Sequence, residues 1–189
     1  AFEHWLQNDQ PVFRNVIKVV GKRLCFPDLS VGGQVLGTSA SFATQAAMHR
    51  TIYRHMEDQR AQLAIGGYLE TRPLYTTDAY EVMGNEGPQW RTVHIGLDFW
   101  EKAGTPVYAP YAGRVHSLQD NAAERDYGPT IILEHEAKAG LRFYTLFGHL
   151  SRADLELLAV GDLVEPGQEI AHIGPAPENG NWPPHLHFQ

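Results

Sequence analysis

The hydrophobic positions divide the chain into two parts near residue 75. From residue 90 onward, short runs rich in β-branched and aromatic residues are separated by Gly- and Pro-containing turns every eight to twelve residues. This spacing predicts a barrel or a sandwich. We expect one helical turn at Asp154–Leu158. We expect strands at Thr92–Phe99, Pro106–Ala109, Gly113–Leu118, Thr130–His135, Leu141–His149, Leu163–Val164, Glu169–Ile173 and His185–Phe188.

The first 75 residues have a different pattern. Val16–Val20 is rich in β-branched residues and predicts a short strand. Residues 39–65 carry apolar side chains at helical spacing between a serine cap and a Gly-Gly pair, and they predict one long helix. The chain is therefore expected to have a mixed α/β N-terminal extension over residues 1–75 and a mainly β domain over residues 76–189.

Two segments of the β domain resemble each other. Residues 104–110 and 161–167 each place a Gly, a valine-containing run and a Pro before an expected strand. Two similar turns would explain this pattern. A duplicated half-barrel, as in barrel-sandwich hybrid folds, would explain it as well.

Composition narrows the classes of function. The chain has 189 residues, 43% of them hydrophobic, and a formal net charge of −7 without any cluster of Lys and Arg, which argues against a nucleic-acid partner. No apolar run approaches the ~20 residues that span a membrane. No signal peptide is visible, so we expect a cytoplasmic location and no membrane partner. The single cysteine, Cys25, excludes an internal disulfide and is expected to be a buried apolar residue.

Two histidine patterns suggest a metal site. His185 and His187 flank Leu186 in an expected strand, so both imidazoles should project to one face while Leu186 faces a core. His94 and Asp98 would also share a face of a strand, with the side-chain-free Gly96 between them. These two residues and one imidazole of the H-x-H pair would make a three-ligand zinc site. A solvated histidine pair and a buried His–Asp hydrogen bond are the structural alternatives.

A third histidine, His149, ends an aromatic strand in the segment Gly-His-Leu-Ser. This position places it at a loop rim near the metal, where it could act as a general acid, a general base or an oxyanion donor. The other histidines in or beside expected strands are interpreted as rim or hydrogen-bonded residues: His116, His135 and His172.

The motifs H-x-G-x-D, G-T-P-V-Y-A-P, G-H-L-S, G-D-L-V-E-P-G and H-L-H-F occur in this order between Trp90 and Gln189. Together they resemble the lysostaphin-type (LytM-like) zinc metallopeptidases. The resemblance implies a barrel-sandwich hybrid fold. It also implies that zinc-bound water attacks a peptide carbonyl. By this resemblance, the zinc ligands are His94, Asp98 and His187, and the catalytic pair is His149 and His185.

The sequence departs from the family pattern before H-L-H-F. The segment 178–184 contains Trp182 and two prolines where the family usually has a loop rich in Gly, Ser and Thr, and Phe147 stands where a Tyr is common. These changes put peptidoglycan in doubt as the substrate, although the ligands and catalytic histidines are kept. We expect the segment to line the substrate groove. Trp90, Trp100 and Trp182 are candidates to flank it, and packing in the core is the equal alternative for them.

The alternative function is a non-catalytic, zinc-containing module. A structural zinc would need a fourth protein ligand, and Cys25 and His116 are the candidates. The chain lacks an initiating Met and ends two residues after His187, which indicates a fragment with neighbouring domains in a longer parent. Residues 84–94 and 178–184 are similar to the metallopeptidase-like segment of large fusions that carry kinase-like and class III aminotransferase domains. Pyridoxal phosphate would then belong to the parent protein.

Overall fold

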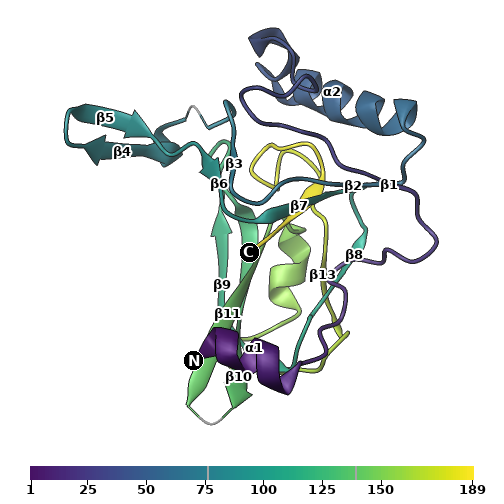
Figure 1. Cartoon of the computed structure of the whole chain (residues 1–189), viewed down its shortest axis with the longest axis vertical. Coiled ribbons are helices and arrows are strands. Elements are labelled where there is room, and N and C mark those ends of the chain that lie inside the picture. The colour runs from purple at the N-terminus through teal and green to yellow at the C-terminus, as the bar shows by residue number, and fades with distance from the viewer. Residues whose placement is uncertain (76, 139) are drawn as a thin grey trace.

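The computed structural model describes residues 1–75, 77–138 and 140–189, and the fold is mainly β, as expected (Figure 1). Its main element is one open sheet, in which β1 and β2 are parallel and the other neighbouring strands are antiparallel. In spatial order the sheet consists of β1 (Leu24–Cys25), β2 (Leu63–Ile65), β7 (Leu97–Trp100), β14 (His185–Phe188), β11 (Leu141–Gly148), β10 (Gly128–Lys138), β9 (Gly113–Asn121) and β12 (Leu163–Val164).

Three two-stranded pairs and five helical segments complete the described elements. The pairs are β13 (Glu169–His172) with β8 (Pro106–Tyr108), β3 (Glu70–Thr71) with β6 (Val93–His94), and β4 (Glu81–Gly84) with β5 (Gly87–Trp90). The α-helices are α1 (Phe2–Asp9) and α2 (Gln45–Asp58), and the 3-10 helices are η1 (Ser39–Ser41), η2 (Asp78–Tyr80) and η3 (Arg152–Glu156). Helix η3 overlaps the expected turn at Asp154–Leu158.

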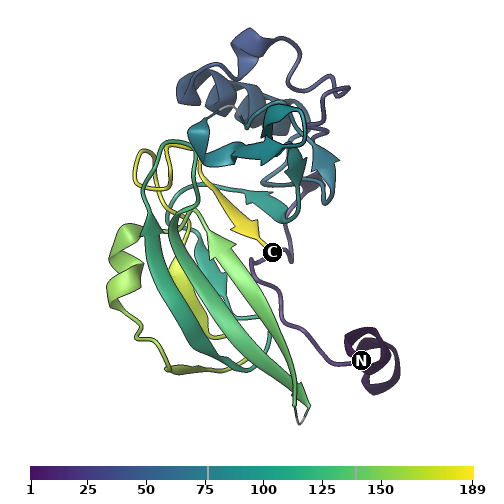
Figure 2. The ribbon, with the colours of Figure 1, turned by 90° about the vertical axis from the view of Figure 1, so that its left-hand side faces the viewer.

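The long strands β9, β10 and β11 run side by side away from the end of the molecule that carries α2 (Figure 2). Alternate residues of β10 point into the core, and Ile131 and Leu133 are completely buried there. Phe147 of β11 and Leu186 of β14 join the same apolar cluster. All the expected strands from residue 106 onward contain an observed strand, because the period-two pattern matches burial on one face of a sheet.

The expected strand Thr92–Phe99 is wrong as a single element. The chain forms β6, leaves strand geometry at Ile95 and Gly96, and then forms β7. The reason is a change of partner, since β6 pairs with β3 whereas β7 pairs with β14 and β2.

The expected helix over residues 39–65 is too long. The observed helix α2 begins after Thr44, whose Oγ1 accepts a hydrogen bond from the backbone N–H of Ala47. It ends at Asp58, and Arg60 then adopts a left-handed φ of 52°. Residues 63–65 form β2 instead, because there Leu63 and Ala64 become completely buried between β1 and β7.

The expected strand at Val16–Val20 is also absent from the described elements. Val16 and Ile17 are buried in the main apolar cluster, and the carbonyl of Val16 accepts a hydrogen bond from Tyr108 N. Val20 is 91% exposed. The β-branched residues of this segment therefore serve as core anchors of an irregular chain.

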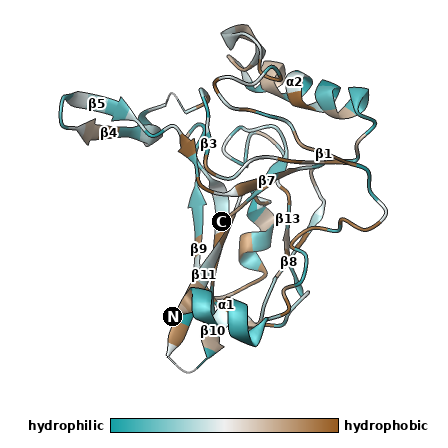
Figure 3. Cartoon of the chain, in the orientation of Figure 1, coloured by the Kyte–Doolittle hydropathy of each residue, from teal (hydrophilic) through white to brown (hydrophobic). Residues whose placement is uncertain are grey.

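The N-terminal extension packs closely on the β domain. Helix α2 carries both hydrophobic and hydrophilic residues (Figure 3), and it buries Met48, Ile52 and Met56 in a second apolar cluster. Trp100 of β7 and Trp182 belong to that cluster too. Residues on both sides of the predicted division at residue 75 thus share one sheet and one cluster. None of the helices in the described ranges has the length and apolar character needed to cross a membrane.

Candidate metal centre

The register between β7 and β14 places two of the candidate ligands opposite each other. Asp98 pairs with His187, and Trp100 pairs with His185. Leu186, between the two histidines, points to the opposite face and is completely buried in the main core. The period-two interpretation of His185-Leu186-His187 is therefore confirmed for the geometry of the strand.

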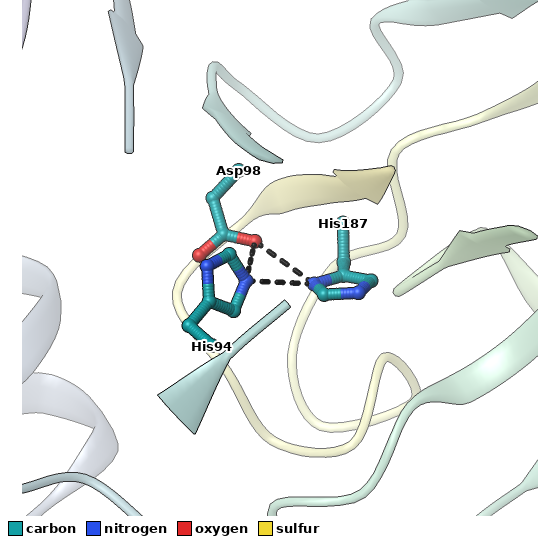
Figure 4. Close-up of side chains that lie close together, drawn as sticks. All are labelled: His94, Asp98 and His187. Carbon is teal, nitrogen blue, oxygen red and sulfur yellow. Dashed lines mark hydrogen bonds and ion pairs between the residues drawn. The ribbon is translucent and has the colours of Figure 1, made fainter. Parts of the chain in front are cut away.

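Three ligand atoms converge at this point, as Figure 4 shows. His94 Nε2 lies 3.1 Å from Asp98 Oδ1 and 3.0 Å from His187 Nδ1. His187 Nδ1 lies 3.2 Å from Asp98 Oδ1. In a tetrahedral zinc site with bonds of about 2.0–2.1 Å, ligand atoms are about 3.3 Å apart. The observed spacing fits a single ion.

The surroundings of His94 and Asp98 also fit a cation. The Nδ1 atom of His94 lies 2.8 Å from the carbonyl oxygen of Gly67, to which it donates, so the lone pair of Nε2 faces the other ligands. The second oxygen of Asp98, Oδ2, accepts a hydrogen bond from the guanidinium of Arg72. Burial alone would raise the pKa of Asp98, but the charge of Arg72 and the imidazole of His94 hold this pKa well below its usual range. Asp98 is therefore a carboxylate.

His149 and His185 lie beside the three ligands. Their ring centroids are 4.3 Å apart, and His185 Nε2 lies 3.7 Å from Asp98 Oδ1. Each ring is oriented by a backbone carbonyl: His185 Nδ1 donates to Pro183 O over 2.7 Å, and His149 Nδ1 donates to Asn179 O over 2.9 Å. In both rings this leaves Nε2 as the atom with a free lone pair.

Burial keeps both of these imidazoles neutral. Desolvation lowers the pKa of His185 to about 4 and the pKa of His149 well below its usual value. The neighbouring imidazoles lower the pKa of His149 further, since two charges cannot be held this close without cost. Two neutral bases are thus placed side by side next to the candidate ligands.

The backbone at His149 is unusual. Its φ of 62° lies in the left-handed region, which a non-glycine residue adopts rarely and often at functional sites. The conformation is held from both sides, because His149 N donates to Tyr127 O over 2.7 Å and His149 O accepts from Gly174 N over 2.9 Å. These bonds turn the imidazole toward His185.

All five candidate residues line one cavity of about 130 Å³. Trp100 and Trp182 also line it, in agreement with the expectation for the segment 178–184, whereas Trp90 is 44% exposed on β5 and is not among the lining residues. The other residues that line the cavity belong to no sequence motif, so the sequence did not indicate them. They include Met48, Arg72, Leu74, Tyr75, Tyr80 and Tyr127.

The remaining histidines and the cysteine lie elsewhere. Completely buried His135 bonds to Ala112 O and Thr145 Oγ1, and His172 contacts Asp154. Cys25 is buried in the second apolar cluster. Within the part of the chain that the structure describes, neither Cys25 nor His116 belongs to the group of candidate ligand atoms.

Two imidazoles and a carboxylate around one point are typical of the ligand sets of catalytic zinc sites. Residues 92–189, just over half of the chain, match the model of peptidase family M23, so the chain belongs to that family. An uncharacterized metalloprotease of Haemophilus influenzae is 33% identical over 96 residues, which are 51% of this chain and 18% of that protein. The chain therefore spans less than a fifth of this curated relative.

Two solved structures are also similar. A zinc-containing peptidase from Vibrio cholerae is 25% identical, covering 65% of this chain and 35% of that one, with a TM-score of 0.40. The catalytic domain of lysostaphin from Staphylococcus simulans is 29% identical, covering 52% of this chain and 66% of that one, with a TM-score of 0.38. The predicted kinase-like and aminotransferase neighbours, the cytoplasmic location and the absence of a nucleic-acid partner stay predictions.

Proposed function

We propose that this chain is a zinc-dependent hydrolase of peptide or amide bonds, with His94, Asp98 and His187 as the zinc ligands. The observation that carries the proposal is the convergence of these three donor atoms beside the neutral pair His149 and His185. A catalytic zinc typically has three protein ligands and keeps one position open, whereas a structural zinc has four. The group of described ligand atoms contains three.

Zinc at such a site lowers the pKa of water to about 7 and polarises the carbonyl of the substrate. The chain's own part is to orient the reactants and to move protons. His149 and His185 each donate Nδ1–H to a backbone carbonyl, so each offers a lone pair at Nε2 toward the cavity. One imidazole can accept the proton of the attacking water and deliver it to the amine that leaves, and the other can accept a second hydrogen bond from the water and so orient it.

Burial assists this proton transfer. Because desolvation lowers the pKa of both histidines, both rings are neutral in the resting site and Nε2 of each is unprotonated. Trp100 stacks on His185 with a centroid distance of 3.9 Å and an interplanar angle of 17°, which fixes the plane of that ring. Tyr127 and Trp182 add aromatic walls to the cavity in which these rings lie.

The test is cleavage of a mixed panel of Gly-rich peptides, D-amino-acid cross-linked muropeptides and ordinary peptides, read by mass spectrometry. The protein is assayed with zinc, with a chelator, and with zinc restored after chelation. We expect cleavage of at least one class, its loss with chelator and its return with zinc. A protein that binds one equivalent of zinc and cleaves no member of the panel would overturn the proposed hydrolase.

A further inference from the structure

Arg72 reaches the candidate metal centre from outside the segment that matches the family. It directly follows β3, whose residues Glu70 and Thr71 pair with His94 and Val93 of β6. Its backbone N–H donates to Thr92 O over 2.8 Å. The side chain is only 3% exposed. The strand that carries the first candidate ligand is thus hydrogen-bonded to the segment that carries Arg72.

The guanidinium of Arg72 joins two carboxylates. Its Nη1 donates to Oδ2 of Asp98, and its Nε donates to Oε2 of Glu70 over 2.6 Å. The other oxygen of Glu70 accepts the backbone N–H of Leu29 over 2.9 Å. A continuous hydrogen-bonded chain therefore runs from the backbone at Leu29 to Asp98, and it fixes the guanidinium at both edges.

Because of this contact, the two oxygens of Asp98 have different partners. Oδ2 is occupied by Arg72, and Oδ1 faces His94 Nε2 and His187 Nδ1. A free carboxylate can rotate and bind a metal through one oxygen or through both. Hydrogen bonds to metal-binding side chains commonly fix their orientation and contribute to metal affinity.

We propose that Arg72 is a positioning residue of the metal centre, which holds Asp98 so that only Oδ1 is offered to the ion. The proposal rests on the proposed function, in which His94, Asp98 and His187 hold a metal. It makes the N-terminal extension part of the centre, since Gly67 and Arg72 both lie before residue 92, where the family match begins.

The surroundings favour arginine over lysine at this position. Two separate donors of one rigid plane meet two acceptors, which the single ammonium of lysine cannot reproduce. Space is provided by Gly66, where a Cβ would lie 2.8 Å from Nη2 of Arg72 and 3.4 Å from Cβ of Asp98. The site is therefore shaped around the guanidinium.

The experiment measures metal binding by the whole chain, with no substrate present. Zinc affinity is determined by competition with a chromogenic chelator for the wild type, Arg72→Lys and Arg72→Met, and Co²⁺ absorption spectra report the coordination. We expect a 10- to 100-fold weaker zinc affinity for Arg72→Met and a smaller loss for Arg72→Lys. We also expect weaker visible absorption of Co²⁺ in Arg72→Met, because a carboxylate that binds through both oxygens raises the coordination number above four.

Arg125→Met is the matched control. Arg125 is a second buried arginine, which stacks over Trp182 at 4.6 Å. Its guanidinium bonds to Phe42 O and Met48 Sδ and faces Glu124, so it is anchored away from the three ligands. This variant should bind zinc as the wild type does. If Arg72→Met does not fold, the zinc affinity and the Co²⁺ spectrum of Arg72→Lys test the proposal instead, since this variant keeps the buried charge.

The outcomes separate the two proposals. A wild type that binds no zinc would refute the metal centre itself. A wild type that binds zinc, with Arg72 variants within about twofold of its affinity and with the same Co²⁺ spectrum, would refute only the positioning role. Equal losses in Arg72→Met and Arg125→Met would also refute it, because the effect would then be general destabilisation.

Discussion

Gly96 leaves the space that the imidazole of His187 occupies. A Cβ at this position would lie 2.5 Å from Cε1 and 2.6 Å from Nε2 of His187, and 2.8 Å from the backbone oxygen of Phe188. The side-chain clash could be relieved by moving the ring, but the clash with the backbone could not. The break between β6 and β7 therefore allows the change of partner strand and also places a residue without a side chain beside His187.

The first prediction follows from this contact. Gly96→Ala should displace His187 and weaken zinc affinity by about tenfold or more, because the ring must leave its place beside Asp98. Gly32→Ala is the control, since nothing lies within 4 Å of a Cβ there and its backbone is not left-handed. Chelator competition checks both variants. Unchanged affinity in a folded Gly96→Ala variant would show that His187 is not a ligand in this position.

The second prediction concerns His149. The variant His149→Ala should keep zinc and lose peptide cleavage by a factor of about 10²–10⁴, the usual contribution of a general acid or base. The reason is that His149 adjoins His185 and is not one of the three converging atoms. Zinc content by mass spectrometry and kcat on the cleaved peptide are measured together. Loss of zinc would instead assign His149 to the ligands, and retained cleavage would refute its catalytic role.

Much of this site follows from local rules that the sequence displays. The common face of His185 and His187 is a property of any strand, and the turn residues indicate the approximate positions of β8 to β14, although β9 and β10 are longer than expected. The break at Gly96 does not follow from such rules, since it depends on which strands β6 and β7 join.

The contribution of the N-terminal extension is equally hidden in the sequence. Arg72 and the carbonyl of Gly67 belong to no motif, and their roles arise only when β3 pairs with β6. The segment Leu63–Ile65 continues an apolar pattern that a helix would also satisfy, so only its burial between β1 and β7 distinguishes strand from helix. Tertiary pairing overrides the local pattern in each of these places.

The third prediction concerns the packing of α2. Ile52 is completely buried between the helix and the second apolar cluster, so Ile52→Ala should lower the free energy of unfolding by about 2–5 kcal/mol. Arg54→Ala on the exposed side of the same helix should change it by no more than about 0.5 kcal/mol. Urea unfolding followed by tryptophan fluorescence compares the two. An equally small effect of both would mean that α2 does not pack on the domain in solution.

The fourth prediction concerns pH and His135, which lies away from the metal centre. Burial lowers the pKa of this imidazole, which donates from Nδ1 to Ala112 O and accepts at Nε2 from Thr145. Since its pKa in the folded state lies below the unfolded value of about 6.5, folding favours the neutral ring. The contribution of the neutral His135 ring to stability is complete above pH 6.5 and is lost as the pH falls below that value.

The measurement is the Tm of zinc-free protein between pH 7.5 and 5. The wild type should lose stability on acidification more steeply than His135→Gln, which has no imidazole to protonate, although other buried histidines give both proteins a common slope. His116→Gln, at an exposed position, should follow the wild type. Parallel curves for the wild type and His135→Gln would show that His135 does not resist protonation in the folded protein.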